Sequence, residues 1–149
     1  MEQIKNILVP IDFSEISERI VKTAVYFAQR YKAKLTIIFV VQDLASYTGA
    51  SITGVSFEEL EGTLLDFAKK RMADYLTKYL TDSPVTFESK VLEGHAAEEI
   101  INFSENENNG VDLIIMGTHG YKGFKKMFMG SVTDKVLRAG SPCPVLTIR

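Results

Sequence analysis

Apolar residues of this chain gather in five short runs that are separated by longer segments of mixed polarity. The runs span residues 7–11, 35–41, 85–92, 111–116 and 144–148. Four of them are almost entirely apolar and rich in Val, Ile and Leu, as buried strands of a parallel sheet are. The run 85–92 alternates apolar and polar residues, which is typical of a strand nearer a sheet edge. The pattern therefore predicts five β-strands.

The segments between the runs carry helical periodicity. In residues 15–31, apolar side chains recur every three or four positions, which predicts an amphipathic helix that Ser14 can cap. Residues 56–80 begin with a capping-box pattern and predict a second, longer helix. Further helices are predicted from Gly94 onward and over 132–138. Because strands and helices alternate along the chain, we expect an α/β fold, a parallel sheet with helices on both faces.

Composition places the chain among ordinary globular proteins. Its 149 residues are 46% hydrophobic and 24% charged, which suits a single domain over residues 1–149. The net charge of −2 argues against a nucleic-acid-binding surface. No apolar run approaches the roughly 18–20 residues of a membrane span, and the N-terminus lacks the apolar core of a signal peptide. Cys143 is the only cysteine, so we expect a cytoplasmic location. From the charge and the short apolar runs, we expect neither nucleic acid nor a membrane as a partner.

A glycine-rich segment directly follows the fourth apolar run. It reads Gly117-x2-Gly120-x9-Gly130-Ser131 and leads into the helix predicted from residue 132. Glycines let the backbone approach an anion closely, and the free N–H groups of a helix N-terminus face it. The segment is neither a Walker A loop nor the dinucleotide fingerprint, because its spacing differs from both. It predicts an anion site of another kind.

Two polar side chains near this segment each allow two interpretations. Asp12 ends the first apolar run, where it can accept hydrogen bonds from an adenine amino group or a ribose hydroxyl, or cap the following helix. His119 lies inside the glycine segment and can bond a phosphate or brace the loop. If the first and fourth strands are neighbours, Asp12 and Gly117 face one crevice at the carboxyl ends of the strands. His95 has a weaker claim, and two distant histidines without a Cys or acidic cluster predict no metal site.

The middle of the glycine segment is basic and apolar. Lys122, Lys125 and Lys126 occur there without an acidic residue, an excess of positive charge that suits a polyphosphate or a solvated surface loop. The apolar side chains between them are expected to anchor the loop to the body of the protein or to a second subunit; they are Phe124, Met127, Phe128 and Met129.

Together, these residues resemble the ATP-binding branch of the universal stress protein family. The resemblance covers essentially the whole chain and rests on the segments 7–14, 112–120 and 141–149 and on the intact glycine motif. It implies a Rossmann-like, adenine nucleotide alpha hydrolase-like fold. That fold is a three-layer sandwich with a five-stranded parallel sheet in the order 3-2-1-4-5.

The resemblance also implies roles at the nucleoside end of a bound ATP. Asp12 would contact the adenosine portion, with Pro10 and Ile11 shaping the pocket beside it. Val40 would meet adenine through its backbone and side chain. The nucleoside side would further be lined by Met116 and Gly117.

At the phosphate end, the resemblance implies backbone N–H contacts from Gly120, Gly130, Ser131 and Val132. A divalent ion, Mg²⁺ or Mn²⁺, would be held by the phosphates, since the motif itself supplies no carboxylate. Family members often carry a basic residue directly after His-Gly. Here Tyr121 takes that place, and Lys122 follows.

The family also dimerises through its last strand. The run 144–148 would otherwise expose an apolar edge, which favours self-pairing, and Pro144 can begin such a strand without disturbing the ladder. We therefore expect a homodimer through this strand.

Three functions follow as hypotheses. The first is a nucleotide-dependent regulatory protein of a stress response, with at most slow ATP hydrolysis, whose nucleotide occupancy alters its dimer or the surface for an unknown protein partner. No residue of the loop is a convincing base for phosphoryl transfer, so no catalytic residue is predicted. The second is a genuine ATPase or phosphotransferase that uses the loop 117–131 with His119 or a lysine. The third is an interaction module that holds no nucleotide.

Overall fold

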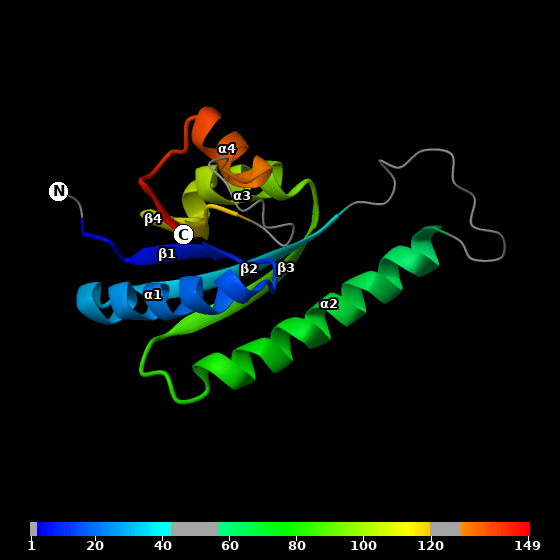
Figure 1. Ribbon diagram of the computed structural model, residues 1–149, viewed down its shortest axis with the longest axis horizontal. Helices are drawn as coiled ribbons and strands as arrows, with labels where there is room; N and C mark the ends of the chain where they lie inside the picture. Colours follow the sequence, from blue (N-terminus) through cyan, green and yellow to red (C-terminus); the bar gives the residue numbers. More distant parts are fainter. Residues whose placement is uncertain (1–2, 43–56, 120–128) are drawn as a thin grey trace.

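Five parallel β-strands pair into one sheet in the order β3-β2-β1-β4-β5 (Figure 1). The computed structural model describes residues 3–42, 57–119 and 129–149. In these, the elements in chain order are β1 (Asn6–Pro10), α1 (Glu15–Tyr31), β2 (Lys34–Gln42), α2 (Phe57–Leu80), β3 (Phe87–Gly94), α3 (Ala96–Glu105), a 3₁₀ turn η2 (Glu107–Asn109), β4 (Leu113–Gly117), α4 (Ser131–Arg138) and β5 (Val145–Ile148). The strand order implied by the resemblance is confirmed.

Helices cover both faces of the sheet. α1 and α2 lie on one side and α3 and α4 on the other (Figure 1). The alternation of side chains along a strand explains the division, because successive residues point to opposite faces. In β1, Ile7 and Val9 pack toward α1 and α2, whereas Leu8 packs toward α3 and α4, and all three are fully buried. A central strand that is buried on both faces needs a continuous apolar sequence, which is what β1 has.

The ends of a strand depend on its pairing with neighbouring strands, and the apolar pattern alone does not locate them correctly. The third strand, predicted over 85–92, runs from Phe87 to Gly94, because its ladder with β2 begins at Leu35 opposite Phe87. Val85 is buried in the core but precedes the ladder. The expected position of this strand at an edge of the sheet is confirmed, and most of its side chains are exposed or half-buried.

The helices follow the predicted periodicity closely. α1 has the predicted bounds, and α2 ends at Leu80 as expected. The predicted capping residue of α2, Ser56, lies outside the described residues. None of the helices in the described part of the chain is long and apolar enough to cross a membrane.

Candidate functional site

β1 and β4, which are neighbours in the sheet, separate at their carboxyl ends. β1 pairs with β4 through only two residues of each strand. Beyond that point, the Ile11 N–H donates to the Ile38 carbonyl of β2 at 2.9 Å, while the Thr118 N–H donates to the Ile148 carbonyl of β5 at 2.8 Å. Because the strand order reverses between β1 and β4, this opening is the place where α/β sheets bind ligands.

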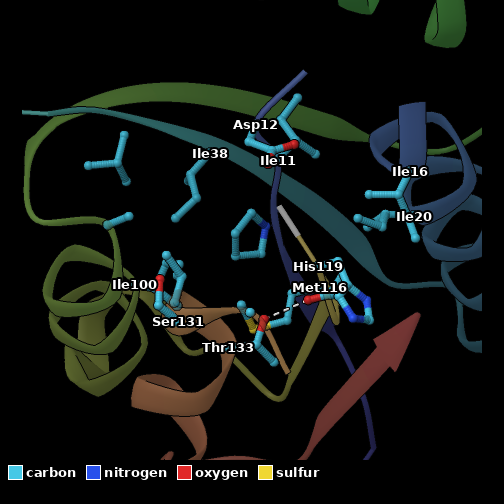
Figure 2. A pocket seen from close by; sticks show the side chains of 16 residues that line it. Ile11, Asp12, Ile16, Ile20, Ile38, Ile100, Met116, His119, Ser131 and Thr133 are labelled. Atoms are coloured by element: carbon cyan, nitrogen blue, oxygen red, sulfur yellow. Dashed lines mark hydrogen bonds between the residues drawn. The ribbon is translucent and has the colours of Figure 1, made fainter. Parts of the chain in front are cut away.

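A pocket occupies this opening, with about 700 Å³ of empty space when the open solvent at its mouth is included (Figure 2). Its walls are mostly apolar and come from β1, β2, β4, α1, α3 and the start of α4. The lining residues are Pro10, Ile11, Asp12, Ile16, Ile20, Ile38, Val40, Ala96, Ile100, Met116, Gly117, His119, Gly130, Ser131, Val132 and Thr133.

This lining brings together every predicted binding residue that the structure describes. The predicted members are Pro10, Ile11, Asp12, Val40, Met116, Gly117, His119, Gly130, Ser131 and Val132. Gly120, Lys122, Lys125 and Lys126 lie outside the described residues. A shared pocket gives these residues one location, and their contacts with a ligand stay a prediction.

Sequence reasoning missed six of the lining residues. They are Ile16, Ile20, Ile38, Ala96, Ile100 and Thr133. Ile38 could have been found, because it lies two positions before Val40 and so points to the same face of β2. Ile16 and Ile20 belong to the apolar face predicted for residues 15–31, and nothing in a helical pattern distinguishes a core position from a pocket wall.

Figure 2 shows two facing walls. Ile16, Ile20 and His119 lie on one side of the pocket, and Ile100 and Ser131 lie on the other. Gly117 has a packing reason of its own, since a Cβ there would approach Ile20 Cδ1 to 3.0 Å and the His119 carbonyl to 3.3 Å. A side chain at residue 117 would therefore require the end of the Ile20 side chain and the backbone at His119 to shift by a few tenths of an ångström.

Asp12 organises the start of α1. Its Oδ1 accepts hydrogen bonds from the Ser14 N–H at 3.0 Å and the Ser17 hydroxyl at 3.0 Å, and also from the Ser14 hydroxyl. Ser17 is fully buried, and its Oγ accepts the Asp12 N–H at 3.3 Å. The helix-supporting interpretation of Asp12 thus has direct geometric support. Ser14 occupies the N-cap position, but the expectation that its side chain caps the helix is wrong, because that hydroxyl bonds Asp12 instead.

The next residue, Phe13, has a left-handed backbone. Its φ is +60°, a conformation that costs a bulky L-residue on the order of 1–3 kcal/mol. Aromatic packing holds it there: its ring centroid lies 4.7 Å from that of Phe39 and 5.4 Å from that of Tyr75, and the Arg71 guanidinium lies 4.6 Å above the ring. The direction of Asp12 therefore depends on β2 and α2 as well as on α1.

His119 is braced on one side of its ring only. Its Nδ1 shares a hydrogen bond with the Thr118 hydroxyl at 2.8 Å. Its Nε2 is buried and has no hydrogen-bond partner among the residues that the structure describes. A buried polar atom without a partner is costly. The hydrogen bond with Thr118 supports the bracing interpretation of His119, and its contact with a ligand stays a prediction.

Helix α4 begins at the pocket with an open N-terminus. Its N-cap is Gly130, with φ −58° and ψ 149°, a residue that has no side chain with which to cap the helix. The first-turn N–H groups of a helix carry the positive end of its dipole and bind anions. Ser131 and Val132 belong to this turn and line the pocket, which gives the apolar cavity one end suited to negative charge.

The described residues offer no carboxylate cage for a metal ion. No group of three or more His, Cys, Asp or Glu side chains gathers in this part of the chain.

Substituting Asp12 separates its helix-supporting role from its charge. We expect Asp12→Ala to lower the free energy of unfolding by about 1–2 kcal/mol, because Oδ1 supports both the Ser14 amide and the Ser17 hydroxyl. Asp12→Asn keeps an acceptor oxygen and should cost less. Chemical denaturation measures both, with the exposed Asp66→Ala in α2 as the control, expected to change stability by no more than about 0.5 kcal/mol. Equal costs for Asp12→Ala and Asp66→Ala would contradict this role.

Known proteins resemble this chain in sequence and in fold over nearly its whole length. A model of the universal stress protein family matches residues 3–149. Universal stress protein YxiE of Bacillus subtilis is 33% identical over 147 residues, covering 95% of this chain and 97% of the relative. The structure of universal stress protein UspA from Lactobacillus plantarum matches with a TM-score of 0.80 at 27% identity, covering 100% of both chains.

A more distant structure shares the fold. The universal stress protein from Archaeoglobus fulgidus in complex with dAMP matches with a TM-score of 0.65 at 16% identity, covering 99% of this chain and 100% of that one. With the family model spanning nearly all residues and the strand order reproduced, the chain belongs to the universal stress protein family.

Proposed function

We propose that this protein is an ATP-binding universal stress protein, a nucleotide-dependent regulator that acts as a homodimer. The observation that carries the proposal is the pocket between β1 and β4, which joins apolar walls to the uncapped N-terminus of α4. An adenine nucleotide has the matching parts, a flat apolar base and an anionic tail. The dAMP bound by the Archaeoglobus fulgidus protein of the same fold supports an adenine nucleotide as the ligand class.

The residues present fit such a ligand at both ends. The base would lie against the apolar side chains of β2 and α3, including Val40 and Ile100. The phosphates would accept hydrogen bonds from the first-turn amides of α4, and His119 belongs to the lining of the same pocket. A Mg²⁺ or Mn²⁺ ion would be held by the phosphates rather than by protein carboxylates.

The described pocket favours holding ATP over hydrolysing it. Its described titratable side chains are Asp12 and His119. Asp12 Oδ1 is committed to the start of α1, and Nδ1 of His119 is committed to Thr118. Rapid phosphoryl transfer needs a base or a water-orienting group aimed at the terminal phosphate. We therefore propose at most slow turnover, with occupancy read by a partner protein in the cytoplasm, where the single cysteine stays reduced.

The homodimer would form through β5, which lies at the edge of the sheet. The carbonyls of Pro144 and Ile148 accept hydrogen bonds from Ile114 in β4 and from Thr118 just after it, at 3.0 and 2.8 Å. Since alternate residues of a strand direct their backbone groups to opposite sides, the N–H and C=O of Thr147 point away from β4. These groups are available to a second copy of the strand.

The phosphate end is tested by Gly130→Asp. Asp is a favoured N-cap residue, so the fold should keep or gain stability, while the carboxylate repels phosphates and lowers ATP affinity about 100-fold or more. The neutral isostere Gly130→Asn caps equally well and controls for the added volume. Isothermal titration calorimetry and thermal melting measure the two effects. Unchanged ATP affinity in Gly130→Asp would mean that phosphate does not bind at α4, and a wild-type chain with neither co-purified nor titratable nucleotide would favour the nucleotide-free module.

Single-turnover hydrolysis separates the regulator from an ATPase. With the wild-type chain in excess over radiolabelled ATP and Mg²⁺, we expect a rate constant well below about 1 s⁻¹, the lower end of ordinary enzyme turnover. The reason is the absence, in the described pocket, of a base beyond Asp12 and His119. A rate of about 1 s⁻¹ or more that His119→Gln abolishes would establish the alternative, an ATPase or phosphotransferase that uses the loop 117–131.

The dimer interface is tested by Thr147→Pro. Proline removes an N–H that points away from β4, so the sheet within the subunit should persist while pairing with a second β5 is lost. We expect the dimer dissociation constant, measured by light scattering over a dilution series, to rise at least about tenfold. Thr147→Val keeps the N–H and serves as the matched control. If Thr147→Pro dimerises as tightly as the wild type, β5 is not the interface.

A further inference from the structure

Thr133 is a buried hydroxyl at the phosphate end of the proposed site. It lies in the first turn of α4 and is only 3% exposed. Its Oγ1 donates a hydrogen bond of 2.6 Å to the carbonyl of Gly117, the last residue of β4, shown as the dashed line from Thr133 in Figure 2. The bond spans 16 residues of sequence and joins the end of a strand to the start of a helix.

A second hydrogen bond joins the same two elements one residue further along. The Gly130 N–H donates to the Thr118 carbonyl at 2.5 Å. Of two consecutive carbonyls, that of Gly117 accepts from Thr133, the third residue of α4, and that of Thr118 accepts from the N-cap Gly130. Two bonds at neighbouring points fix both the distance and the rotation of the helix N-terminus relative to β4.

Apolar packing alone would leave that placement less defined. The other fully buried residue of α4, Val136, packs against the cluster on the α3 side of the sheet. Such contacts are non-directional, so the helix could shift along them at little cost. The amide-to-phosphate hydrogen bonds proposed above tolerate only a few tenths of an ångström around 2.9 Å. A directional bond near the first turn is thus what phosphate binding at α4 requires.

We propose that Thr133 is a positioning residue for nucleotide phosphates: its hydroxyl holds the first turn of α4 at the end of β4, so that the amides of Ser131 and Val132 face the pocket. The inference rests on the proposed function and adds a residue to it. Thr133 acts through the backbone of its neighbours. Its loss should therefore weaken the phosphate-dependent part of binding and spare the nucleoside part.

The test compares Thr133→Val with Thr133→Ser. Valine fills the same space without a donor, and serine keeps the hydroxyl. Affinities for ATP and for adenosine are measured on each full-length variant, below its melting temperature. We expect Thr133→Val to weaken ATP binding about tenfold with adenosine affinity unchanged, and Thr133→Ser to retain most of the ATP affinity.

Thr36→Val is the matched control. Thr36 is 7% exposed and donates a hydrogen bond to Glu88 at 3.1 Å, outside the pocket lining. The same substitution there should leave the ratio of the two affinities unchanged. If Thr133→Val loses its native circular dichroism spectrum, Thr133→Ala, which removes the hydroxyl without a new branched contact, replaces it.

The outcomes separate the inference from the function on which it rests. Equal losses of ATP and adenosine affinity in Thr133→Val, or no loss of either, would overturn the positioning role while leaving the nucleotide site in place. A wild-type chain that binds neither ATP nor adenosine would overturn the proposed function and the positioning role together.

Discussion

The separation of β1 from β4 is the constraint on which the rest of this molecule depends. β1 is buried on both faces and pairs with β2 along its whole length. Its pairing with β4 ends after two residues, so the last part of β1 has β2 as its only strand neighbour among the described residues. Parallel strands need crossover connections, and these place α1 and α2 on one face and α3 and α4 on the other. β1 leads into α1 on one face, whereas α4, the helix that follows β4, lies on the other face. The pocket is the space that this topology leaves open.

How far the sequence predicts such a molecule depends on whether a feature is local. The apolar runs predict all five strands, and helical spacing predicts the bounds of α1. Both patterns can be recognised because they involve residues that are close together in the sequence. Asp12 and Gly117 can be placed from the sequence because each follows or ends a strand and strand ends meet at one edge, whereas Val40 is implied only by the family resemblance. Ile100 was not found, because an apolar residue on α3 becomes a pocket wall only through the packing of that helix over the sheet.

Phe13 shows a limit of a different kind. Its left-handed backbone has no signal in the sequence, since a phenylalanine after aspartate is compatible with many turns. The conformation is imposed by partners that lie far along the chain, among them Phe39 in β2 and Tyr75 in α2. Burial raises the pKa of the Tyr75 hydroxyl, so this ring stays neutral within the cluster. Tertiary packing thus overrides the local preference at the residue beside Asp12.

The proposed site holds its ligand mainly with backbone, and this has a consequence for regulation. Backbone amides at the N-terminus of α4 keep their direction only if the start of the helix is fixed relative to the sheet. The carbonyls of Gly117 and Thr118 fix it by accepting hydrogen bonds from Thr133 and Gly130. The same Thr118 donates its N–H to the Ile148 carbonyl in β5. One residue therefore contacts both the start of α4 and the edge strand through which dimerisation is predicted. A change in the position of α4 on nucleotide binding would reach β5 through a single peptide, without a side-chain relay.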